Sequence, residues 1–263
     1  MENVLGSGEF TVTEWVPNDH YTLTKNEKYW GEEPIATSIT VRVIPEGSAR
    51  TIALEAGEVD LVWNVDPTDC ANVEANSDVA LLSQPSSSIE YLGMNTTKEK
   101  FSDERVRQAI NYALDKQTFV DTIVEGRGTV ANSYINSTIP GWSEEEEAYP
   151  YDPEKAKQLF DEAMAEEGLD KLTLTLHYSD TELMAQMSEF LQQSWPKVFG
   201  ADRFELKLQA MPANQLSQVK RGWKTNPASY ELSWGGWVGN DLSPWNSFKY
   251  WTSYYSNKNE PYL

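Results

Sequence analysis

The sequence predicts an α/β fold, and three observations lead to this prediction. Segments in which apolar and polar residues alternate, the pattern of half-buried strands, occur along most of the chain. Segments with apolar residues at helical spacing, bounded by capping residues, follow several of them. The 263 residues, 40% of them hydrophobic, are enough for a packed core in one large domain or two smaller ones. Such a mixture of strands and helices is typical of layered α/β folds.

The first ninety residues are expected to form mainly strands. Residues 10–16 alternate, residues 17–19 carry a Pro-Asn-Asp turn signal, and the alternation resumes at 21–26, so this region predicts a β-hairpin. A third alternating segment, 39–44, predicts a strand that ends at Pro45.

One short helix interrupts these strands. Ser48 is a residue type that caps helices, and Gly57 has the position expected for the glycine that ends one. A further strand is predicted at 59–63. The resulting strand–helix–strand order indicates an α/β layer.

The second half of the chain is predicted to contain more helix. Ser102 is the expected cap of one helix, with Phe101 and Val106 at the spacing of a hydrophobic staple around it. Alternating segments at 172–178 and 204–211 predict two strands in this half.

Two more helices follow from local signals. Asp152 is the predicted cap of the first, Pro153 its first residue and Gly168 its end. Ser179 and Glu182 form a capping-box pattern, which predicts the start of the second.

The charge and the residue counts exclude several kinds of function. The net charge of −20 repels phosphate backbones, so nucleic acid is not an expected partner. Cys70 is the single cysteine, which excludes an internal disulfide and a cysteine-based zinc site. His20 and His177 are not part of a metal-ligand or nucleophile motif. No metal, cofactor or catalytic residue is therefore expected.

Aromatic residues are concentrated near the end of the sequence. Five of the ten tryptophans lie within 223–263, and the densest segment is 233–251. Rings at this density, interrupted by Gly and Pro, favour the wall of a binding site, although the edge of an ordinary core would give the same pattern.

Four stretches of the sequence resemble one known family. They are GSGEFTVTEW with LTKNEKYW, then ALEAGEVDLV, YLGMNTTKEKFSDERVRQAINYALDKQ and WVGNDLSP. Together they are similar to the extracellular solute-binding proteins of peptide ABC transporters, the oligopeptide- and dipeptide-binding group of solute-binding family 5. The first stretch departs from the family pattern, with Ser7 in place of Thr and Glu9 in place of Pro.

The resemblance implies a two-lobe fold of the type II periplasmic-binding-protein kind. Residues 1–95 would belong to lobe I, 96–101 would cross between the lobes, and 102–263 would form lobe II. Asn95 and Thr96 would act as the hinge in closure over a ligand. Family members are usually longer, so the chain is expected to be a piece of such a protein, incomplete at both ends.

The resemblance also implies where a ligand binds. In peptide-binding relatives the segment similar to WVGNDLSP runs along the ligand and hydrogen-bonds its main chain. That role would fall on Gly236, Trp237 and Val238, with Trp234 among the rings that face the ligand.

An aspartate in the same family segment pairs with the free amino group of the peptide. Here Asn240 aligns with that position and Asp241 follows it. Because an amide carries no charge, either Asp241 binds the amine or the ligand has no free amine at this point. The second possibility would suit an oligosaccharide stacked on tryptophan.

Three kinds of function are compatible with the sequence. The first is a ligand-binding subunit that delivers oligopeptides, or oligosaccharides, to the membrane permease of an ABC transporter. The second is a carbohydrate-active enzyme with paired carboxylates, although no motif positions such a pair. The third is a structural domain on the cell surface. The first is preferred, and a monomer is expected.

The resemblance places the full-length protein outside the cytoplasm, either periplasmic or as a membrane-anchored extracellular lipoprotein. The residues after Met1 have neither the basic nor the apolar segment of a signal peptide, so this chain is expected to lack one.

Overall fold

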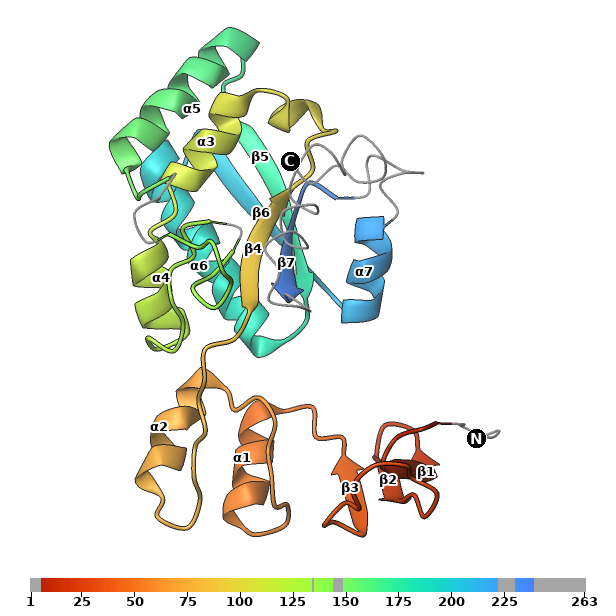
Figure 1. The fold of residues 1–263 in the computed structure, drawn as a ribbon. Coiled ribbons are helices and arrows are strands. Elements are labelled where there is room, and N and C mark those ends of the chain that lie inside the picture. The colour runs from red at the N-terminus through yellow and green to blue at the C-terminus, as the bar shows by residue number, and fades with distance from the viewer. Residues whose placement is uncertain (1–5, 134, 144–148, 222–229, 239–263) are drawn as a thin grey trace. The chain divides into compact units, whose positions relative to one another are not determined.

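The computed structural model describes residues 6–133, 135–143, 149–221 and 230–238, without the side chain of Trp237. Figure 1 shows the elements, which are β1 (Phe10–Val16), β2 (His20–Lys25), β3 (Ser38–Arg42), α1 (Gly47–Glu55), α2 (Pro67–Ala75), β4 (Ser88–Met94), η1 (Glu99–Phe101), α3 (Glu104–Tyr112), α4 (Lys116–Ile123), α5 (Pro153–Glu167), β5 (Leu172–Ser179), α6 (Glu182–Phe199), β6 (Phe204–Met211), α7 (Ala213–Arg221) and β7 (Leu232–Val238). No helix among the described residues is long and apolar enough to cross a bilayer.

The chain divides into two compact units, Met1–Leu81 and Leu82–Leu263. The division differs from the expected lobe boundary after residue 95. The reason is the pairing of β4: all seven of its residues pair with β7, so β4 belongs to the second unit.

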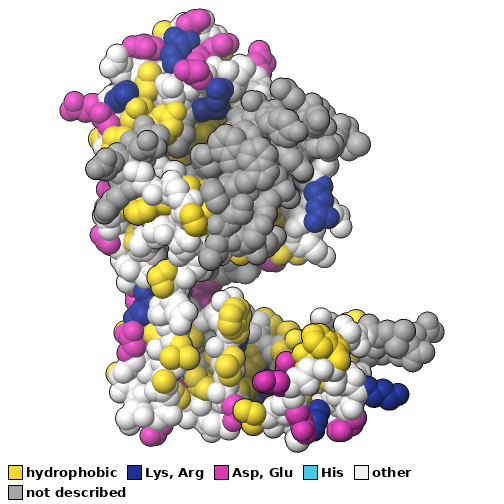
Figure 2. Space-filling view, in the orientation of Figure 1, with side chains coloured by type: hydrophobic (Ala, Val, Ile, Leu, Met, Phe, Trp, Pro, Cys, Tyr) yellow, Lys and Arg dark blue, Asp and Glu magenta, His cyan; other side chains and the backbone are white. Residues whose placement is uncertain are grey.

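The first unit contains a three-stranded antiparallel sheet in the order β1-β2-β3 and the helices α1 and α2. The predicted hairpin and third strand are thereby confirmed. Gly57 follows α1 with a φ of 70°, as predicted for the glycine that ends the helix. Few side chains of the first unit are buried. Figure 2 shows apolar side chains at the surface of this unit, where Trp30 is 81% and Trp63 80% exposed.

Two predictions for the first unit are wrong, and one helix was not predicted. Residues 59–63 form no strand, and the side chain of Leu61 is exposed. The structure instead has the helix α2, in which Pro67 is the first residue. Ser48 does not cap α1, because the helix begins one residue earlier and the Ser48 hydroxyl lies 3.3 Å from a carboxylate oxygen of Asp69.

The second unit is built on a four-stranded sheet in the order β4-β7-β5-β6. The two strands predicted in this half are confirmed as β5 and β6, which pair in parallel over their full length, while β4 and β7 are antiparallel. Helices α3, α5 and α6 cover one face of the sheet, and α7 lies on the other (Figure 1). The layered α/β prediction is confirmed for this unit.

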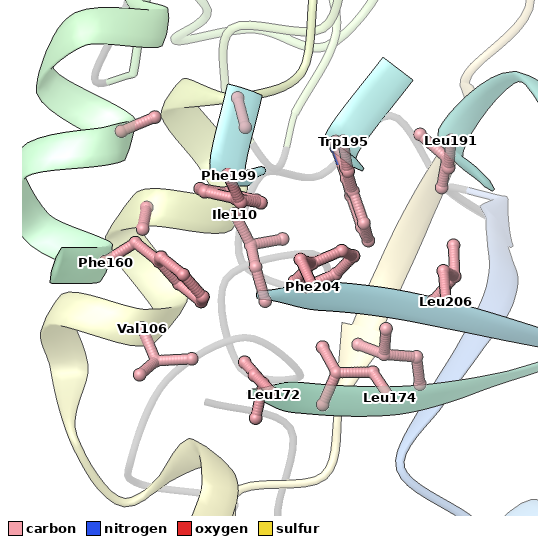
Figure 3. Packing of buried hydrophobic residues seen from close by; sticks show 14 of the residues in the cluster. Val106, Ile110, Phe160, Leu172, Leu174, Leu191, Trp195, Phe199, Phe204 and Leu206 are labelled. Carbon is pink, nitrogen blue, oxygen red and sulfur yellow. The ribbon is translucent and has the colours of Figure 1, made fainter. Parts of the chain in front are cut away.

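The hydrophobic core lies between the sheet and the helices α3, α5 and α6. Figure 3 shows that aromatic rings from α5, α6 and β6 meet there, with aliphatic side chains of β5 beneath them. Phe160 and Phe199 lie 4.7 Å apart by ring centroids, and Phe204 contacts both. The apolar stripes predicted for the helices are core residues.

Two helices of this unit are capped by a different residue from the one predicted, and one predicted cap is confirmed. α3 is capped by Asp103 rather than Ser102, because Ser102 ends the short helix η1. α6 is capped by Thr181 rather than Ser179, which is still part of β5. The cap of α5 is Asp152, as predicted.

Candidate ligand-binding site

The candidate site is centred on β7, the strand to which the sequence assigns the ligand-binding backbone. One edge of β7 is bonded to β4, in a register that places Trp237 opposite Ile89 and Val238 opposite Ser88. On the other edge, β5 pairs with β7 at Leu232 and Ser233 alone. Among the described residues, the edge from Gly235 to Val238 that faces away from β4 therefore has no partner strand. We call this segment the open edge of β7.

Trp234 lies just before the open edge and points into the core. Its side chain is 7% exposed, and its indole Nε1 donates to Ser188 Oγ at 3.0 Å. The ring also packs against Phe119 of α4. Trp234 is therefore a core residue, which corrects its prediction as a ligand-facing ring.

Gly235 occupies the opposite face of the strand, because successive residues alternate. A Cβ atom at this position would lie 2.6 Å from Cζ of Tyr91 and 2.9 Å from Nζ of Lys220. A side chain fits there only if the ends of the Tyr91 and Lys220 side chains move. The absence of a Cβ thus lets Tyr91 and Lys220 approach the backbone of β7.

Lys220, in the last turn of α7, is held against the same strand. Its Nζ donates to the carbonyl oxygen of Trp234 at 3.1 Å and lies 5.9 Å from the centre of the Tyr91 ring. Burial lowers the pKa of Lys220, while the charge of Glu90 acts in the opposite direction.

Glu90 is the residue of β4 opposite Gly236. A Cβ at Gly236 would lie 2.6 Å from Oε1 of Glu90, so this second glycine also makes room for a side chain of the neighbouring strand. The Glu90 side chain reaches the surface, yet enough protein surrounds it that desolvation raises the pKa of its carboxyl group, against the effect of Lys220. The two glycines thus adjoin one cationic and one acidic group.

His177 of β5 adds a buried imidazole to the sheet. It pairs with Ser233, and its side chain is 7% exposed. Burial lowers the pKa of His177, so its ring is neutral near pH 7. It therefore contributes no positive charge to the sheet.

The remaining predicted site residues lie beyond the described part of the chain. Asn240, Asp241 and the segment 239–251 fall there, and for Trp237 only the backbone is described. The assignment of the amine partner stays a prediction.

The predicted hinge residues lie inside the second unit. Asn95 is fully buried, its Nδ2 donates to the carbonyl of Tyr230, and its backbone N–H donates to that of Glu231, each at 2.9 Å. Thr97 is bonded to the Asn95 side-chain oxygen. These bonds fix the end of β4 against the segment that leads into β7. A hinge movement at Asn95 and Thr96 stays a prediction.

A hollow of about 350 Å³ lies between β4 and α3. Its polar lining residues on α3 are bonded within that helix or to the turn before it: Arg107 to the carbonyls of Phe101 and Ser102, Gln108 to Glu104, and Asn111 to Arg107. This hollow is less suited to a polar ligand than the open edge. Among the described residues, no group of three His, Cys, Asp or Glu side chains gathers as a metal site would require.

Sequence reasoning missed Tyr91, Glu90 and Lys220 as neighbours of the ligand-binding strand. Tyr91 and Glu90 belong to the segment before Asn95 that resembles the family, and the pairing of β4 with β7 brings them beside the glycines. Lys220 precedes β7 on a helix that carried no recognised signal. Only the folded arrangement brings it to Gly235.

The chain is similar to known proteins in both sequence and structure. The family model "Bacterial extracellular solute-binding proteins, family 5 Middle" matches residues 1–259. Heme-binding protein A of Haemophilus influenzae is 29% identical over 230 residues, which cover 86% of this chain and 38% of that protein. The dipeptide-binding protein of Escherichia coli is 26% identical over 249 residues, which cover 94% of this chain and 45% of that protein.

Among solved structures, the chain is similar to the periplasmic binding protein DppA of Helicobacter pylori in complex with the peptide STSA. The TM-score is 0.82 at 25% identity, over 93% of this chain and 45% of that one. The chain thus spans less than half the length of these relatives.

Proposed function

Since the chain belongs to family 5 of the bacterial extracellular solute-binding proteins, we propose that it is part of the ligand-capturing subunit of an ABC importer and that its ligands are oligopeptides. The observation that carries the proposal is the open edge of β7. Its backbone N–H and C=O groups are held in an extended conformation by β4 on one side, and the other side accepts an extended chain.

Strand addition of this kind favours peptides over other solutes. An extended peptide presents donors and acceptors at the spacing of a strand. It would bond the backbone groups of the open edge that face away from β4, those of Gly236 and Val238, regardless of its side chains. The names of two relatives agree with this class: one is a dipeptide-binding protein, and another was solved with the peptide STSA. A third relative is named for heme, so membership of the family does not by itself determine the class of ligand.

The wider role follows from the same family. We propose that the full-length protein acts outside the cytoplasm, periplasmic or anchored as a lipoprotein, and that it delivers its ligand as a monomer to a membrane permease. It binds without chemical conversion of the ligand and without a cofactor.

A thermal-shift screen tests the proposal. The 263-residue chain, and the longer natural protein if this chain is a part of one, are mixed with peptides of two to six residues, with N-acetylated peptides and with short oligosaccharides. A peptide at about a hundred times its dissociation constant should stabilise the folded protein by roughly 2.7 kcal/mol. Stabilisation by oligosaccharides alone would replace the peptide class by the sugar class.

Trp237→Ala checks the segment that is assigned to the ligand. We expect this variant to bind the best peptide of the screen about tenfold more weakly, because a large flat ring contributes much of the contact area in such a site. Unchanged affinity, measured by isothermal titration calorimetry, would remove Trp237 from the site.

A further inference from the structure

His177 is a buried histidine at the junction of two strands. It belongs to β5 and pairs with Ser233 of β7, and its side chain is 7% exposed. Among the described residues, this pair and the pair of Leu176 with Leu232 are the only two that join β5 to β7. Leu176 and Tyr178 point into the core, so His177 between them points to the face of the sheet that α7 covers (Figure 1).

The surroundings of the ring suit its neutral form. Nδ1 is buried and has no hydrogen-bond partner among the described residues. A neutral imidazole has one nitrogen without a hydrogen, so Nδ1 can stay bare at little cost. An imidazolium has a hydrogen on both nitrogens. It would bury a positive charge and an N–H donor for which the described residues provide no acceptor.

The carboxylate that acts on this ring is already engaged. The charge of Glu231, the residue before β7, acts to raise the pKa of His177. However, one oxygen of Glu231 accepts from Nζ of Lys100 at 2.6 Å, and the other accepts from the backbone N–H of Thr175 at 2.7 Å. Lys98 brings a positive charge, which acts to lower the pKa of His177. A proton on the ring would therefore have no free counter-ion in this group.

The strand and the helix beside His177 add no acid. The residue opposite it on β6 is Gln209, which is neutral. Helix α7 packs against β5, and its charged residues, Lys220 and Arg221, are both basic. The side chain of Gln209 and the carbonyl of Leu232 act to raise the pKa of His177, but burial is the largest effect and lowers it.

We propose that the junction of β5 with β7 opens at mildly acidic pH, when the buried imidazole of His177 takes up a proton. Of its two partner strands, β7 would then keep β4 alone. The inference goes beyond the proposed function, because it concerns the sheet itself and does not depend on the class of ligand.

The direction of the pH dependence follows from the two states of His177. In an opened junction the ring titrates near its ordinary pKa of about 6.5, whereas the pKa in the closed junction is lower. Between these two values the opened form binds more protons, so the contribution of His177 to stability is lost as the pH falls through this window. His20 has the opposite sign, because Asp19 and Glu14 bond its ring and raise its pKa.

The experiment measures amide hydrogen exchange in β5 and β7 at pH 7 and pH 5, by mass spectrometry on the 263-residue chain. The unaltered protein is compared with His177→Gln, which has a neutral polar side chain that does not titrate. His20→Gln is the matched control, because it removes the other histidine of the sequence. Each rate is divided by the chemical exchange rate at that pH, so that only the opening of the strands is compared.

We expect the unaltered protein and His20→Gln to lose protection in β5 and β7 by about tenfold between pH 7 and pH 5, since each unit of pKa difference corresponds to a factor of ten in the opening equilibrium. His177→Gln should have the same protection at both pH values. An equal loss in His177→Gln would overturn the inference, and so would unchanged protection in the unaltered protein.

A second measurement leaves residue 177 unaltered. His20→Gln retains a single histidine, so the one imidazole signal in its NMR spectrum reports His177 directly. We expect this signal to titrate below pH 6.5 or so, and a pKa at or above about 6.5 would overturn the inference whatever the exchange data show.

Discussion

At the scale of single residues, the second unit depends on polar side chains that satisfy backbone groups. Asp103 accepts a hydrogen bond from the backbone N–H of Arg105 at 2.8 Å and pairs with the guanidinium of the same residue. Arg105 also reaches Glu166, at the end of α5. One carboxylate thus begins α3, and its partner cation connects α3 to α5.

We predict that Asp103→Ala lowers the free energy of unfolding by about 1–2 kcal/mol at pH 7, because it removes a helix cap and an ion pair. The hydrogen bond from Arg105 lowers the pKa of the Asp103 carboxyl group in the folded protein. A lowered folded-state pKa contributes stability above the unfolded pKa of about 3.9, and this contribution disappears as the pH falls through the folded value.

Urea denaturation at pH 7 and at pH 3 checks this prediction. The difference between the unaltered protein and Asp103→Ala should shrink at the lower pH. Asp103→Asn is the matched control, because it keeps a capping oxygen and loses the charge. An equal difference at both pH values would mean that the charge of Asp103 contributes nothing.

The caps also show how far local sequence signals predict structure. Asp152, Pro153 and Gly168 define α5 because all three signals lie within the helix or at its ends. At α3 the neighbours Ser102 and Asp103 are both good capping types, so the sequence alone does not choose between them. The choice of Asp103 agrees with contacts to Arg105 and, through it, to the distant Glu166.

At the scale of elements, β7 depends on the absence of side chains at Gly235. We predict that Gly235→Ala destabilises the protein by about 1–3 kcal/mol and weakens peptide binding, because the added Cβ would meet Tyr91 at 2.6 Å. Chemical denaturation and calorimetry measure the two effects.

Gly93→Ala is the control for this prediction. Gly93 lies in β4, and a Cβ there would meet its nearest atoms at 3.5 and 3.6 Å, which is ordinary contact. This variant should stay close to the unaltered protein in stability. Equal destabilisation by both changes would contradict the contact with Tyr91 as the cause.

Several elements of the second unit were predictable from periodicity, although α4 and α7 were not, and the contacts at the site were not predictable either. Residues 204–211 alternate, and the structure has β6 at Phe204–Met211. The orientation of Trp234 depends on Ser188, a residue of α6 that no local pattern connects with it. In the first unit, residues 59–63 have the composition of a strand but pair with no strand among the described residues. Composition alone therefore predicted a strand wrongly.

At the scale of the whole molecule, the two units differ in how much they bury. Of the large side chains that are almost fully buried among the described residues, Val73 belongs to the first unit and the rest to the second, including Trp195, Phe160 and Phe204. Local stability follows buried apolar contact.

We therefore predict slow amide hydrogen exchange in β5 and β6 and much faster exchange in β1, β2 and β3. Hydrogen–deuterium exchange with mass spectrometry on the 263-residue chain measures both regions in one sample. The first unit should gain protection in a longer protein that supplies cover for its exposed tryptophans. Equal protection of the two units in the 263-residue chain would contradict the prediction.

The family and the general fold could be predicted from the sequence, because four separate stretches resembled family 5, and the family model matches residues 1–259. The division into two units could not be predicted in this way, because β4 pairs with residues 232–238, which lie far along the sequence.

The order of the strands also affects how the sheet can assemble during synthesis. Among the described residues, β7 is the last strand of the second unit along the chain, yet it lies between β4 and β5. Until residue 238 has left the ribosome, β4 has no neighbour in this sheet and β5 can pair with β6 alone. Closure across so long a sequence separation is slow, and the early strands stay unpaired meanwhile.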